Sequence, residues 1–594
     1  MDDEWKRPSE SRPAFSTLVE ILRHRALQLP GRRAYTFLVD GEAEEVSLTY
    51  EQLDRKARAI GAMLQELGLS GERALLLYPS GLQFIEALFG CFYAGVVAVP
   101  AYPPRVNRSL LRLQTTVEDA QAGFVLTTSS ILSKLKPACE QAPVLSVLRW
   151  LDTEKVPEGA EARWRQPSIT GETLAFLQYT SGSTSAPKGV MVSHGNLIHN
   201  EWAIQTACLN TQESTFVSWL PVYHDMGLIG IVLQALYVGA SCILMSPLAF
   251  LQRPLRWLAA ISRYGATLSG GPNFAYDLCV RRISQQQRSV LDLSSWKIAF
   301  NGSEPIRAET VSRFAAAFKE CGFREESFFP CYGLAEATLM VSGNMRSGMP
   351  LVRTYEGAAL ERNRVVEASA GSVGARALVG CGYSLSDQKI LIVDPLSLAE
   401  CPADQSGEIW VSGPSVAQGY WNREAETLAT FRARRSDSTE GRFLRTGDLG
   451  FLHAGELFVT GRLKDVIVIR GRNIHPQDIE DTVGRSHPAL RPGGGAAFSV
   501  NVASEERLVV VQEVDNHREL DMNSVIGAIR QAIAEEYDVP VFSISLVKPG
   551  NMPKTTSGKL QRGACRDSFL NAALATVGEW RTFLEPATEA SHEG

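Results

Sequence analysis

Three consecutive segments decide the fold: RALLLYPS (73–80), GLQFIEALFGCFYAG (81–95) and VVAVPAY (96–102). The first and third are short β-rich runs, and the second is a longer helical stretch. Because parallel strands are joined by crossovers that are usually helices, this order predicts a parallel sheet covered by helices.

The same alternation returns further along the chain. It is present in TFVSWLP (215–221), the helical MGLIGIVLQALYVG (226–239), ASCILMS (240–246), a predicted helix over 250–264, ATLSGG (266–271), KIAFNGS (297–303) and a predicted helix over 305–320. Ligands of such sheets bind at the carboxyl ends of the strands. We therefore expect the chemistry in the loops that follow strands.

After Gly380 the chain becomes strand-rich, and a last α+β module begins near Lys464. The module is predicted as strand 465–471, helix 476–487, strands 496–501 and 506–515, helix 519–536 and strand 540–547. The predicted fold is α/β. It has a large N-terminal domain (1–463) of parallel sheets with helices and a β-subdomain, and a small mobile α+β domain (464–594).

Composition excludes several classes of protein. At 594 residues the chain is longer than a single hydrophobic core can usually serve, so at least two domains are expected. A net charge of −6 supplies no basic field for nucleic acid. The N-terminus, MDDEWKRPSE, has no apolar core of a signal peptide, and we expect no membrane span. Ten scattered cysteines without a C-x-x-C pair suggest reduced thiols in a cytoplasmic protein.

A polar loop, TSGSTSAPKG (180–189), follows the strand-like TLAFLQY (173–179). Its closely spaced backbone N–H groups, its hydroxyls and the ammonium of Lys188 suit a polyphosphate, and we call it the phosphate loop. It is not a Walker A loop, because Gly189 rather than Ser or Thr follows the lysine. Taken alone, such a stretch is also typical of a plain surface loop.

Further motifs follow the phosphate loop in a fixed order: YHDMG (223–227), NGSEP (301–305), CYGLAEAT (331–338), RTGDLG (445–450), GRLKD (461–465) and PKTTSGK (553–559). With these motifs the chain resembles, over nearly its whole length, the adenylate-forming superfamily that includes acyl-CoA synthetases and luciferases. The resemblance implies ATP and Mg²⁺ as substrate and cofactor.

The resemblance also implies the site residues. Those expected to bind the nucleotide are Thr180, Ser181, Gly182, Ser183, Thr184, Lys188, Gly302, Ser303, Glu304, Tyr332, Gly333, Leu334, Ala335, Asp448 and Arg462. Within this set Tyr332 would stack on adenine, and Asp448 would accept hydrogen bonds from the ribose hydroxyls. Glu336 would help hold Mg²⁺. Each of these residue types is also common in ordinary cores or on ordinary surfaces.

Lys559 is implied as the catalytic lysine, bridging the attacking carboxylate and the α-phosphate. Lys464 is implied as the hinge about which the C-terminal module rotates between two half-reactions. His224 would lie near the carboxylate of the acid as a contact or gate, although a lone histidine is usually structural.

The acid pocket is expected in the apolar segments 219–237 and 266–278, at Trp219, Met226, Gly227, Ile231, Gly270 and Phe274. Ordinary core packing is the alternative explanation for most of these side chains. The Phe-Asp-x-Ser signature of amino-acid-activating relatives has no match here, so a fatty acid is the expected substrate.

Five segments resemble the fatty acyl-AMP ligase branch: VPAYPPR (99–105), LPVYHDMGLIG (220–230), FNGSEPIR (300–307), YGLAEATLMVSG (332–343) and IRGRNIHPQDIE (469–480). The extra segment at about 355–379 resembles the insertion of that branch, which disfavours transfer to CoA, although it also resembles a long surface loop. We therefore expect no CoA. The expected acceptor is a separate acyl carrier protein, or a carrier domain of a polyketide or nonribosomal peptide synthase.

Two rival hypotheses stay open at this point. A long-chain acyl-CoA synthetase would form acyl-CoA when CoA is supplied. A non-catalytic nucleotide- or lipid-binding paralogue would release no pyrophosphate, although it would have no need for Lys559.

Overall fold

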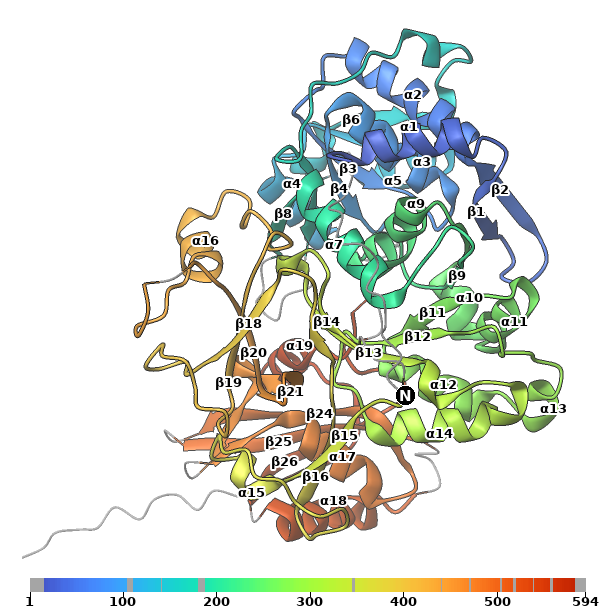
Figure 1. Ribbon diagram of the computed structural model, residues 1–594. Coiled ribbons are helices and arrows are strands. Elements are labelled where there is room, and N and C mark those ends of the chain that lie inside the picture. The colour runs from blue at the N-terminus through green and yellow to red at the C-terminus, as the bar shows by residue number, and fades with distance from the viewer. Residues whose placement is uncertain are drawn as a thin grey trace, which may run out of the picture. The chain divides into compact units, whose positions relative to one another are not determined.

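The computed structural model describes residues 15–103, 110–139, 142–179, 187–344, 348–439, 441–469, 472–502, 505–515, 520–537, 539–555 and 559–582 (Figure 1). Internal contacts divide the chain into two units. The first unit comprises Met1–Thr354 and Ala377–Val459, and the second comprises Tyr355–Arg376 and Thr460–Gly594.

The first unit contains a six-stranded sheet in the order β6-β5-β3-β4-β7-β8. Its strands are β3 (Arg73–Leu77), β4 (Val97–Ala101), β5 (Phe124–Thr127), β6 (Arg149–Asp152), β7 (Leu174–Tyr179) and β8 (Gly189–Ser193). All neighbours are parallel except β7 and β8. Helix α3 (Leu82–Ala94) connects β3 to β4 and ends at Gly95 in the left-handed conformation, φ 67°. The predicted strand–helix–strand unit is confirmed.

A nine-stranded sheet has the order β17-β14-β13-β12-β11-β9-β10-β1-β2. Its strands are β1 (Arg33–Leu38), β2 (Glu45–Thr49), β9 (Thr215–Ser218), β10 (Ser241–Met245), β11 (Leu268–Gly271), β12 (Ile298–Asn301), β13 (Phe328–Gly333), β14 (Met340–Gly343) and β17 (Tyr383–Ser384). The strands from β13 to β1 run parallel, and the edge strands are antiparallel. The predicted parallel sheet is again confirmed.

The helices of the first unit surround these sheets (Figure 1). They are α1 (Leu18–Gln28), α2 (Tyr50–Glu66), α4 (Leu111–Ala120), α5 (Ser129–Cys139), α6 (Pro143–Ser146), α7 (His194–Cys208), α8 (Asp225–Gly227), the π-helix η3 (Leu228–Leu233), α9 (Gln234–Val238), α10 (Pro247–Gln252), α11 (Leu255–Tyr264), α12 (Asn273–Arg282), α13 (Gln285–Arg288), α14 (Ala308–Phe318) and α16 (Glu424–Phe431), with short 3₁₀ turns η1 (Thr153–Lys155), η2 (Ala160–Arg163), η4 (Lys319–Cys321), η5 (Glu325–Ser327) and η6 (Ala335–Ala337). The prediction of one helix over 250–264 is wrong. Two helices occupy it, because Pro254 has no N–H to continue α10.

The strand-rich part after Gly380 forms a four-stranded antiparallel sheet, β18-β19-β20-β21, as predicted. Its strands are β18 (Lys389–Val393), β19 (Gly407–Ser412), β20 (Leu444–His453) and β21 (Glu456–Arg462).

The second unit has its own sheet, β24-β25-β26-β27, and its own hydrophobic core. Its elements are the turn η7 (Leu463–Asp465), the hairpin β22 (Ile467–Ile469) and β23 (Arg472–Ile474), α17 (Pro476–Ser486), β24 (Leu490–Val502), β25 (Glu505–Val514), α18 (Met522–Tyr537), β26 (Val541–Val547), α19 (Arg562–Leu570) and β27 (Thr576–Arg581). The predicted α+β module is confirmed, while α19 and β27 are additions that the strand and helix patterns did not predict.

The segment expected as an insertion packs with the second unit. It contains α15 (Gly357–Leu360) between the paired strands β15 (Val352–Glu356) and β16 (Ala375–Val379). The second unit thus begins with a detached piece of chain from the middle of the sequence.

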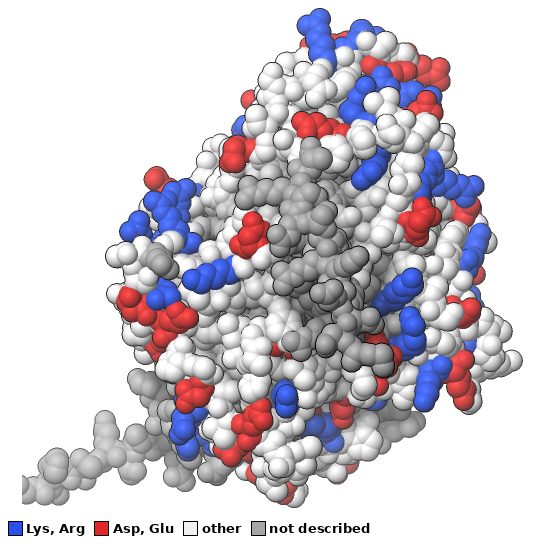
Figure 2. Space-filling model, in the orientation of Figure 1, with Lys and Arg blue, Asp and Glu red and all other residues white. Residues whose placement is uncertain are grey.

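Three further features concern the cysteines, membrane spans and surface charge. All ten cysteines are free thiols, and most are buried. Among the described residues no helix is both long and apolar enough to cross a membrane. On the face in view, basic and acidic side chains are interspersed (Figure 2).

Candidate active site

The residues expected to bind adenine and ribose meet in the first unit. Tyr332, near the end of β13, donates its hydroxyl hydrogen to the Asp448 carboxylate in β20 at 2.8 Å. Both side chains are largely buried, with the residues 8% and 7% exposed. A hydrogen bond to a buried carboxylate holds both groups in one orientation. The tyrosine ring and the carboxylate expected to accept from ribose are therefore held together.

Close backbone approaches explain two glycines of the expected adenine slot. A Cβ on Gly333 would lie 1.8 Å from the Leu339 carbonyl oxygen, and one on Gly302 would lie 2.8 Å from the Cys331 carbonyl oxygen. Ser303 adopts φ 76°, a left-handed conformation that is uncommon for a residue with a side chain. The chain after β12 is therefore held in a strained turn beside β13.

The turn that carries Leu334 and Ala335 is closed by its own backbone. The Leu334 N–H donates to the Leu339 carbonyl at 2.9 Å, and the Ala335 carbonyl accepts from the Thr338 N–H at 2.9 Å. Glu304 reaches a different element, since its carboxylate accepts from the Phe274 N–H at 2.8 Å, in the first turn of α12. These contacts join the expected nucleotide turns to the helix of the expected acid pocket.

Glu336, the expected Mg²⁺ ligand, lies in η6 and accepts a hydrogen bond from the Tyr420 hydroxyl at 2.8 Å. Among the described residues no cluster of three or more His, Cys, Asp or Glu side chains is arranged to hold a metal. A single carboxylate suits Mg²⁺, which is commonly bound by one or two carboxylates together with substrate phosphates. Glu336 therefore fits that ion as a partial ligand.

Lys188 is the one expected phosphate-binding residue of the phosphate loop that the structure describes. The other residues expected to bind phosphate, Thr180, Ser181, Gly182, Ser183 and Thr184, lie outside the described residues. The Lys188 ammonium pairs with the Glu426 carboxylate and lies 5.0 Å from the centre of the Tyr420 ring. The hydrogen bond from Lys188 holds the pKa of Glu426 below its usual range.

Several polar residues around Lys188 were not predicted from the sequence. Arg423 donates to Glu426 at 3.1 Å and to Asp119 at 2.6 Å, and Asp119 also accepts from the Tyr179 hydroxyl at 2.7 Å. Burial raises the pKa of the Tyr179 hydroxyl above its ordinary value. The position of Tyr179 directly before the phosphate loop was the only local signal for this group.

The expected acid-pocket residues are buried in aromatic and backbone contacts. Trp219 stacks on Phe250 with ring centres 4.1 Å apart and meets Phe274 edge-on at 5.9 Å. A Cβ on Gly227 would lie 2.3 Å from the Pro221 carbonyl oxygen, and one on Gly270 would lie 2.2 Å from that of Phe300. Ile231 and Met226 are also buried. Packing therefore accounts for both glycines whether or not an acyl chain lies beside them.

His224 directly precedes α8. Its Nδ1 atom pairs with the carboxylate of the neighbouring Asp225 at 2.5 Å. Its backbone N–H donates to the Pro221 carbonyl at 3.1 Å. The ring is thus oriented by the turn that also fixes Gly227.

Lys559 belongs to the second unit, where the backbone places it. Its N–H donates to the Thr555 hydroxyl at 3.0 Å, and its carbonyl accepts from the Thr555 N–H at 2.7 Å. Lys554 and Leu560, which flank Thr555 and Lys559, form an antiparallel bridge. Arg462 and Lys464 also belong to this unit, at the end of β21 and in η7, and both are exposed.

Buried ion pairs join the insertion to the rest of the second unit. Arg376 donates to Glu361 at 3.1 Å and pairs with Asp478 of α17, while Arg472 donates to Glu361 at 2.8 Å. Arg472 also donates to the Tyr537 carbonyl at 2.5 Å. The Glu361 side chain is only 5% exposed, so these contacts fix residues 355–376 on the module.

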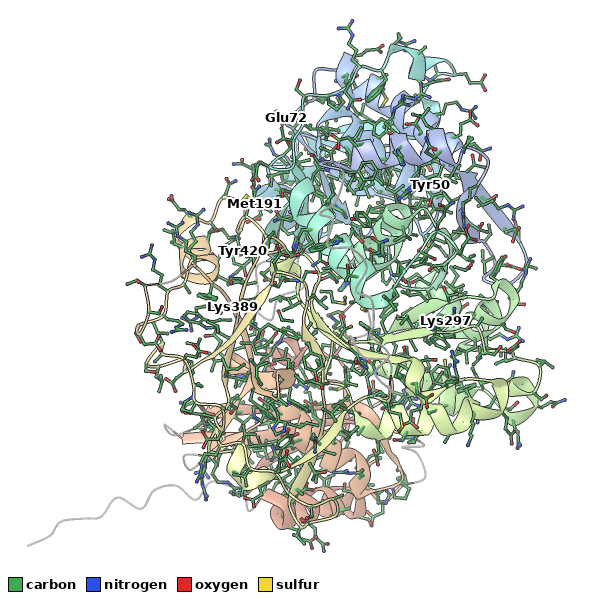
Figure 3. The ribbon with its side chains drawn as sticks, in the orientation of Figure 1. Tyr50, Glu72, Met191, Lys297, Lys389 and Tyr420 are labelled. Carbon is green, nitrogen blue, oxygen red and sulfur yellow. The ribbon has the colours of Figure 1, made fainter. Side chains whose placement is uncertain are left out.

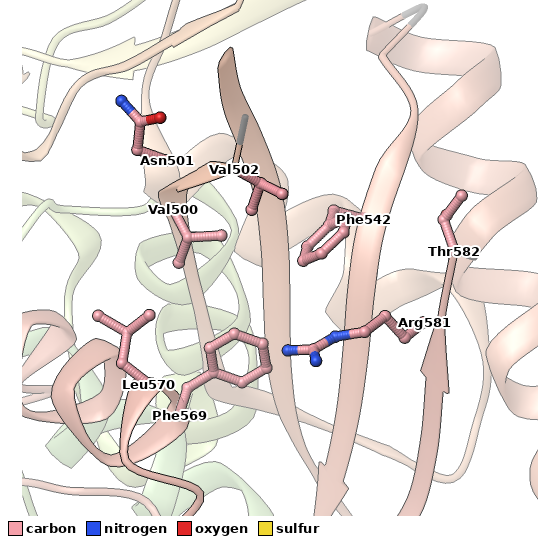
Figure 4. Close-up of a pocket in the computed structure, with 8 residues that line it drawn as sticks. All are labelled: Val500, Asn501, Val502, Phe542, Phe569, Leu570, Arg581 and Thr582. Carbon is pink, nitrogen blue, oxygen red and sulfur yellow. The ribbon is translucent and has the colours of Figure 1, made fainter. Parts of the chain in front are cut away.

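A groove of about 410 Å³ also lies in the second unit (Figure 4). It is lined by Val500, Asn501, Val502, Phe542, Phe569, Leu570, Arg581 and Thr582. None of the predicted site residues lines it, so the groove is separate from the expected chemistry.

Two family models match the sequence. The model described as AMP-binding enzyme matches residues 22–421, and the Disco-interacting protein 2-like AMP domain matches residues 464–579. The first match covers most of the first unit, including Tyr332 and the contacts of Tyr420 with Glu336 and Lys188. Together with the parallel sheets, these matches define an AMP-binding enzyme.

Individual relatives narrow the class. The medium-chain-fatty-acid–[acyl-carrier-protein] ligase JamA of Moorena producens is 51% identical over 98% of this chain and 99% of its own. The long-chain-fatty-acid–AMP ligase FadD32 of Mycolicibacterium smegmatis is 35% identical over 95% of each chain. A crystal structure of fatty acyl-adenylate ligase from L. pneumophila, in complex with acyl adenylate and pyrophosphate, has 43% identity, covers 96% of this chain and 98% of that one, and gives a TM-score of 0.75. The chain therefore belongs to the fatty acyl-AMP ligases.

Proposed function

We propose that this protein joins a fatty acid to AMP, using ATP and releasing pyrophosphate, and then passes the acyl group to the phosphopantetheine thiol of a carrier protein. The observation that supports this most directly is the arrangement in the first unit, where Tyr332 is bonded to Asp448 and Tyr420 connects Lys188 with Glu336. These residues supply an aromatic face for the base, a hydrogen-bond acceptor for the ribose, a cation for the phosphates and a carboxylate for Mg²⁺, which are the groups that bind a nucleoside triphosphate.

In the adenylation step a carboxylate oxygen of the acid bonds to the α-phosphorus, and the bond from that phosphorus to the pyrophosphate oxygen breaks. Two anions must approach each other, so positive charge at the reacting phosphate is the main requirement. We assign this charge to Lys559, with Lys188 on the outer phosphates. Mg²⁺ bound through Glu336 would neutralise further phosphate charge.

Two relatives support a medium-chain acid and a carrier acceptor. JamA and the Teredinibacter turnerae ligase TtuA, 35% identical over 96% of this chain, are both named medium-chain-fatty-acid–[acyl-carrier-protein] ligases. The buried Trp219 and Ile231 and the half-buried Phe274 offer hydrocarbon contact for such a chain. The ten free thiols suit a reducing compartment such as the cytoplasm.

The attachment of the insertion supports a carrier thiol over CoA as the acceptor. The Arg376 and Arg472 ion pairs make residues 355–376 move with the module that carries Lys559. Rotation of that module about Lys464 would bring the insertion along and so restrict the arrangements that a second substrate meets.

The decisive experiment offers the purified protein ATP, Mg²⁺ and fatty acids from hexanoate to hexadecanoate. The products are identified by mass after addition of nothing, of CoA, or of a phosphopantetheinylated carrier protein. Acyl-AMP alone, unchanged by CoA and consumed by the carrier, is the expected result. Formation of acyl-CoA would make the protein an acyl-CoA synthetase, and the lack of any acid-dependent pyrophosphate release would overturn the adenylation itself.

A further inference from the structure

Tyr420 occupies a fixed place beside the strand that follows the phosphate loop. It forms an antiparallel bridge with Val190 of β8, and the neighbouring residues extend this contact. The Met191 N–H donates to the Gly419 carbonyl at 2.9 Å, and the Trp421 N–H donates to the Gly189 carbonyl at 2.8 Å. Figure 3 labels Met191 and Tyr420 close together. The tyrosine is therefore placed by the backbone and is 7% exposed.

The Tyr420 side chain contacts two groups of the proposed nucleotide site. Its hydroxyl donates to Glu336 at 2.8 Å, and the Lys188 ammonium lies over its ring at 5.0 Å. An ammonium over an aromatic face is stabilised by the electrons of the ring. One side chain thus positions both the carboxylate and the cation.

Glu426 completes the surroundings of the Lys188 ammonium. The two form an ion pair, and the Glu426 side chain remains 39% exposed. Arg423 donates to the other oxygen of the carboxylate at 3.1 Å and is itself bonded to Asp119. Arg423 therefore holds one carboxylate oxygen of Glu426 while the other oxygen pairs with Lys188.

A polyphosphate and the Glu426 carboxylate are both anions, and each attracts the same ammonium. A nucleotide that binds Lys188 must therefore weaken its contact with Glu426.

We propose that Tyr420 and Glu426 are positioning residues that hold Lys188 in a resting place, for which the phosphates of the nucleotide compete. The proposal rests on the phosphate-binding role assigned to Lys188 above. The proposal predicts the direction in which ATP affinity changes. Removing the charge of Glu426 strengthens the binding of ATP, whereas the loss of a merely structural contact would weaken it.

The test is a calorimetric titration of ATP in EDTA and without fatty acid, so that neither metal nor turnover contributes. Glu426→Gln should bind ATP about tenfold more tightly than the parent, because an uncharged amide competes much less with the phosphates for the Lys188 ammonium. Glu42→Gln is the matched control, because Glu42 is 43% exposed and pairs with two cations, Arg253 and Arg256. It should leave the affinity unchanged. Equal or weaker binding by Glu426→Gln would overturn the proposal.

Further variants separate the resting place from direct repulsion between Glu426 and ATP. In a Lys188→Ala background, Glu426→Gln should change the affinity by less than about twofold. A full tenfold change there would mean that Glu426 acts on the ligand without the lysine, against the proposal. Tyr420→Leu should bind ATP about two- to fivefold more tightly, the usual strength of an exposed cation–π contact, and Tyr420→Phe should match the parent because it keeps the ring. If Tyr420→Phe and Tyr420→Leu bound ATP equally more tightly, the aromatic ring would not be the group that holds Lys188.

Failure of this proposal is distinguishable from failure of the proposed function. Acid-dependent pyrophosphate release is measured on the parent protein in the presence of Mg²⁺. If the parent releases pyrophosphate and Glu426→Gln does not bind ATP more tightly, only the resting place is wrong. If the parent releases none, adenylation itself is wrong.

Discussion

The two units of this protein place their proposed active-site residues by different means. In the first unit, contacts between side chains place the residues. Tyr332 is hydrogen-bonded to Asp448, and Tyr420 is hydrogen-bonded to Glu336. Glu426 forms an ion pair with Lys188. In the second unit, two hydrogen bonds between the Lys559 backbone and Thr555 place Lys559, while the buried ion pairs attach the insertion. We expect the first unit to bind the nucleotide and Lys559 of the second unit to act in the chemical step.

This difference has a measurable consequence. Substitutions in the first unit should change nucleotide affinity, and substitution of the turn in the second unit should change the chemical step with little effect on affinity. The predictions below test that division.

The largest effect is expected from Lys559→Ala. Removal of one preorganised charge from a reacting centre typically costs about 10²- to 10³-fold in rate, and we expect that fall in acyl-AMP formation. ATP affinity, measured by calorimetry, should stay within about threefold of the parent. Lys554→Ala is the matched control, because Lys554 is an exposed lysine of the same turn. A normal rate for Lys559→Ala, or a large loss of ATP affinity, would break the division.

Arg376→Ala should destabilise the second unit by about 3 kcal/mol in chemical denaturation. The variant removes the cation that pairs with both Glu361 and Asp478 and is itself only 14% exposed, and breaking a buried pair costs much more than breaking an exposed one. Arg472 still pairs with Glu361, so the larger part of the loss falls on Asp478. Arg253→Ala serves as the control, since its pair with Glu42 is 53% and 43% exposed, and should cost less than about 1 kcal/mol.

The same Arg376→Ala variant tests the role of the insertion. If attachment of residues 355–376 disfavours CoA, loosening it should raise the yield of acyl-CoA while the rate of acyl-AMP formation stays near the parental value. A destabilised variant that still makes no acyl-CoA would show that the ion pairs stabilise the module without selecting the acceptor.

Asp448→Asn should weaken ATP binding about tenfold or more, since hydrogen bonds to a charged group are worth about 1.5–3 kcal/mol. Tyr332→Phe keeps the ring and loses only the 2.8 Å bond to Asp448, so its loss should be smaller. Calorimetry measures both. If Asp448→Asn changed the rate of adenylation and left the affinity intact, the first unit would not be primarily a binding unit.

The fold was predictable where hydrophobic pattern and element length agreed. The β3–α3–β4 unit follows from two β-rich runs and a helix that is buried on nearly all sides. The strand β27 was missed because only Val577 and Trp580 of Thr576–Arg581 are large apolar residues, and the strand pairs at the edge of its sheet.

The site was predictable only where a motif marks a residue. Tyr332, Glu336 and Asp448 lie in motifs that resemble a known superfamily, and their individual roles stay predictions. Tyr420 and Glu426 reach Lys188 only because the chain after β19 returns to β8, across more than two hundred residues. No local pattern encodes that contact, since it arises from the pairing of distant segments.

The smallest expected effect is a loss of stability in acid that both units share. Burial lowers the pKa of His475 in the second unit to about 4, and likewise that of His194 in the first. An unfolded histidine titrates near 6.5, so the unfolded chain takes up the proton first as pH falls. The stability due to each neutral ring is complete above about pH 6.5 and is lost as the pH falls toward 4. Between pH 7 and 5.5 each unit should lose about 1 kcal/mol.

Denaturation curves at the two pH values test this, with His475→Gln as the variant. Nδ1 of His475 is buried and has no hydrogen-bond partner among the described residues, so burial is the main cause that favours the neutral ring, and the Arg376 charge adds to it. The variant should abolish the acid sensitivity of the transition that belongs to the second unit and leave that of the first. If His475→Gln changed both transitions equally, the two units would unfold together, and the division between them would hold for chemistry but not for stability.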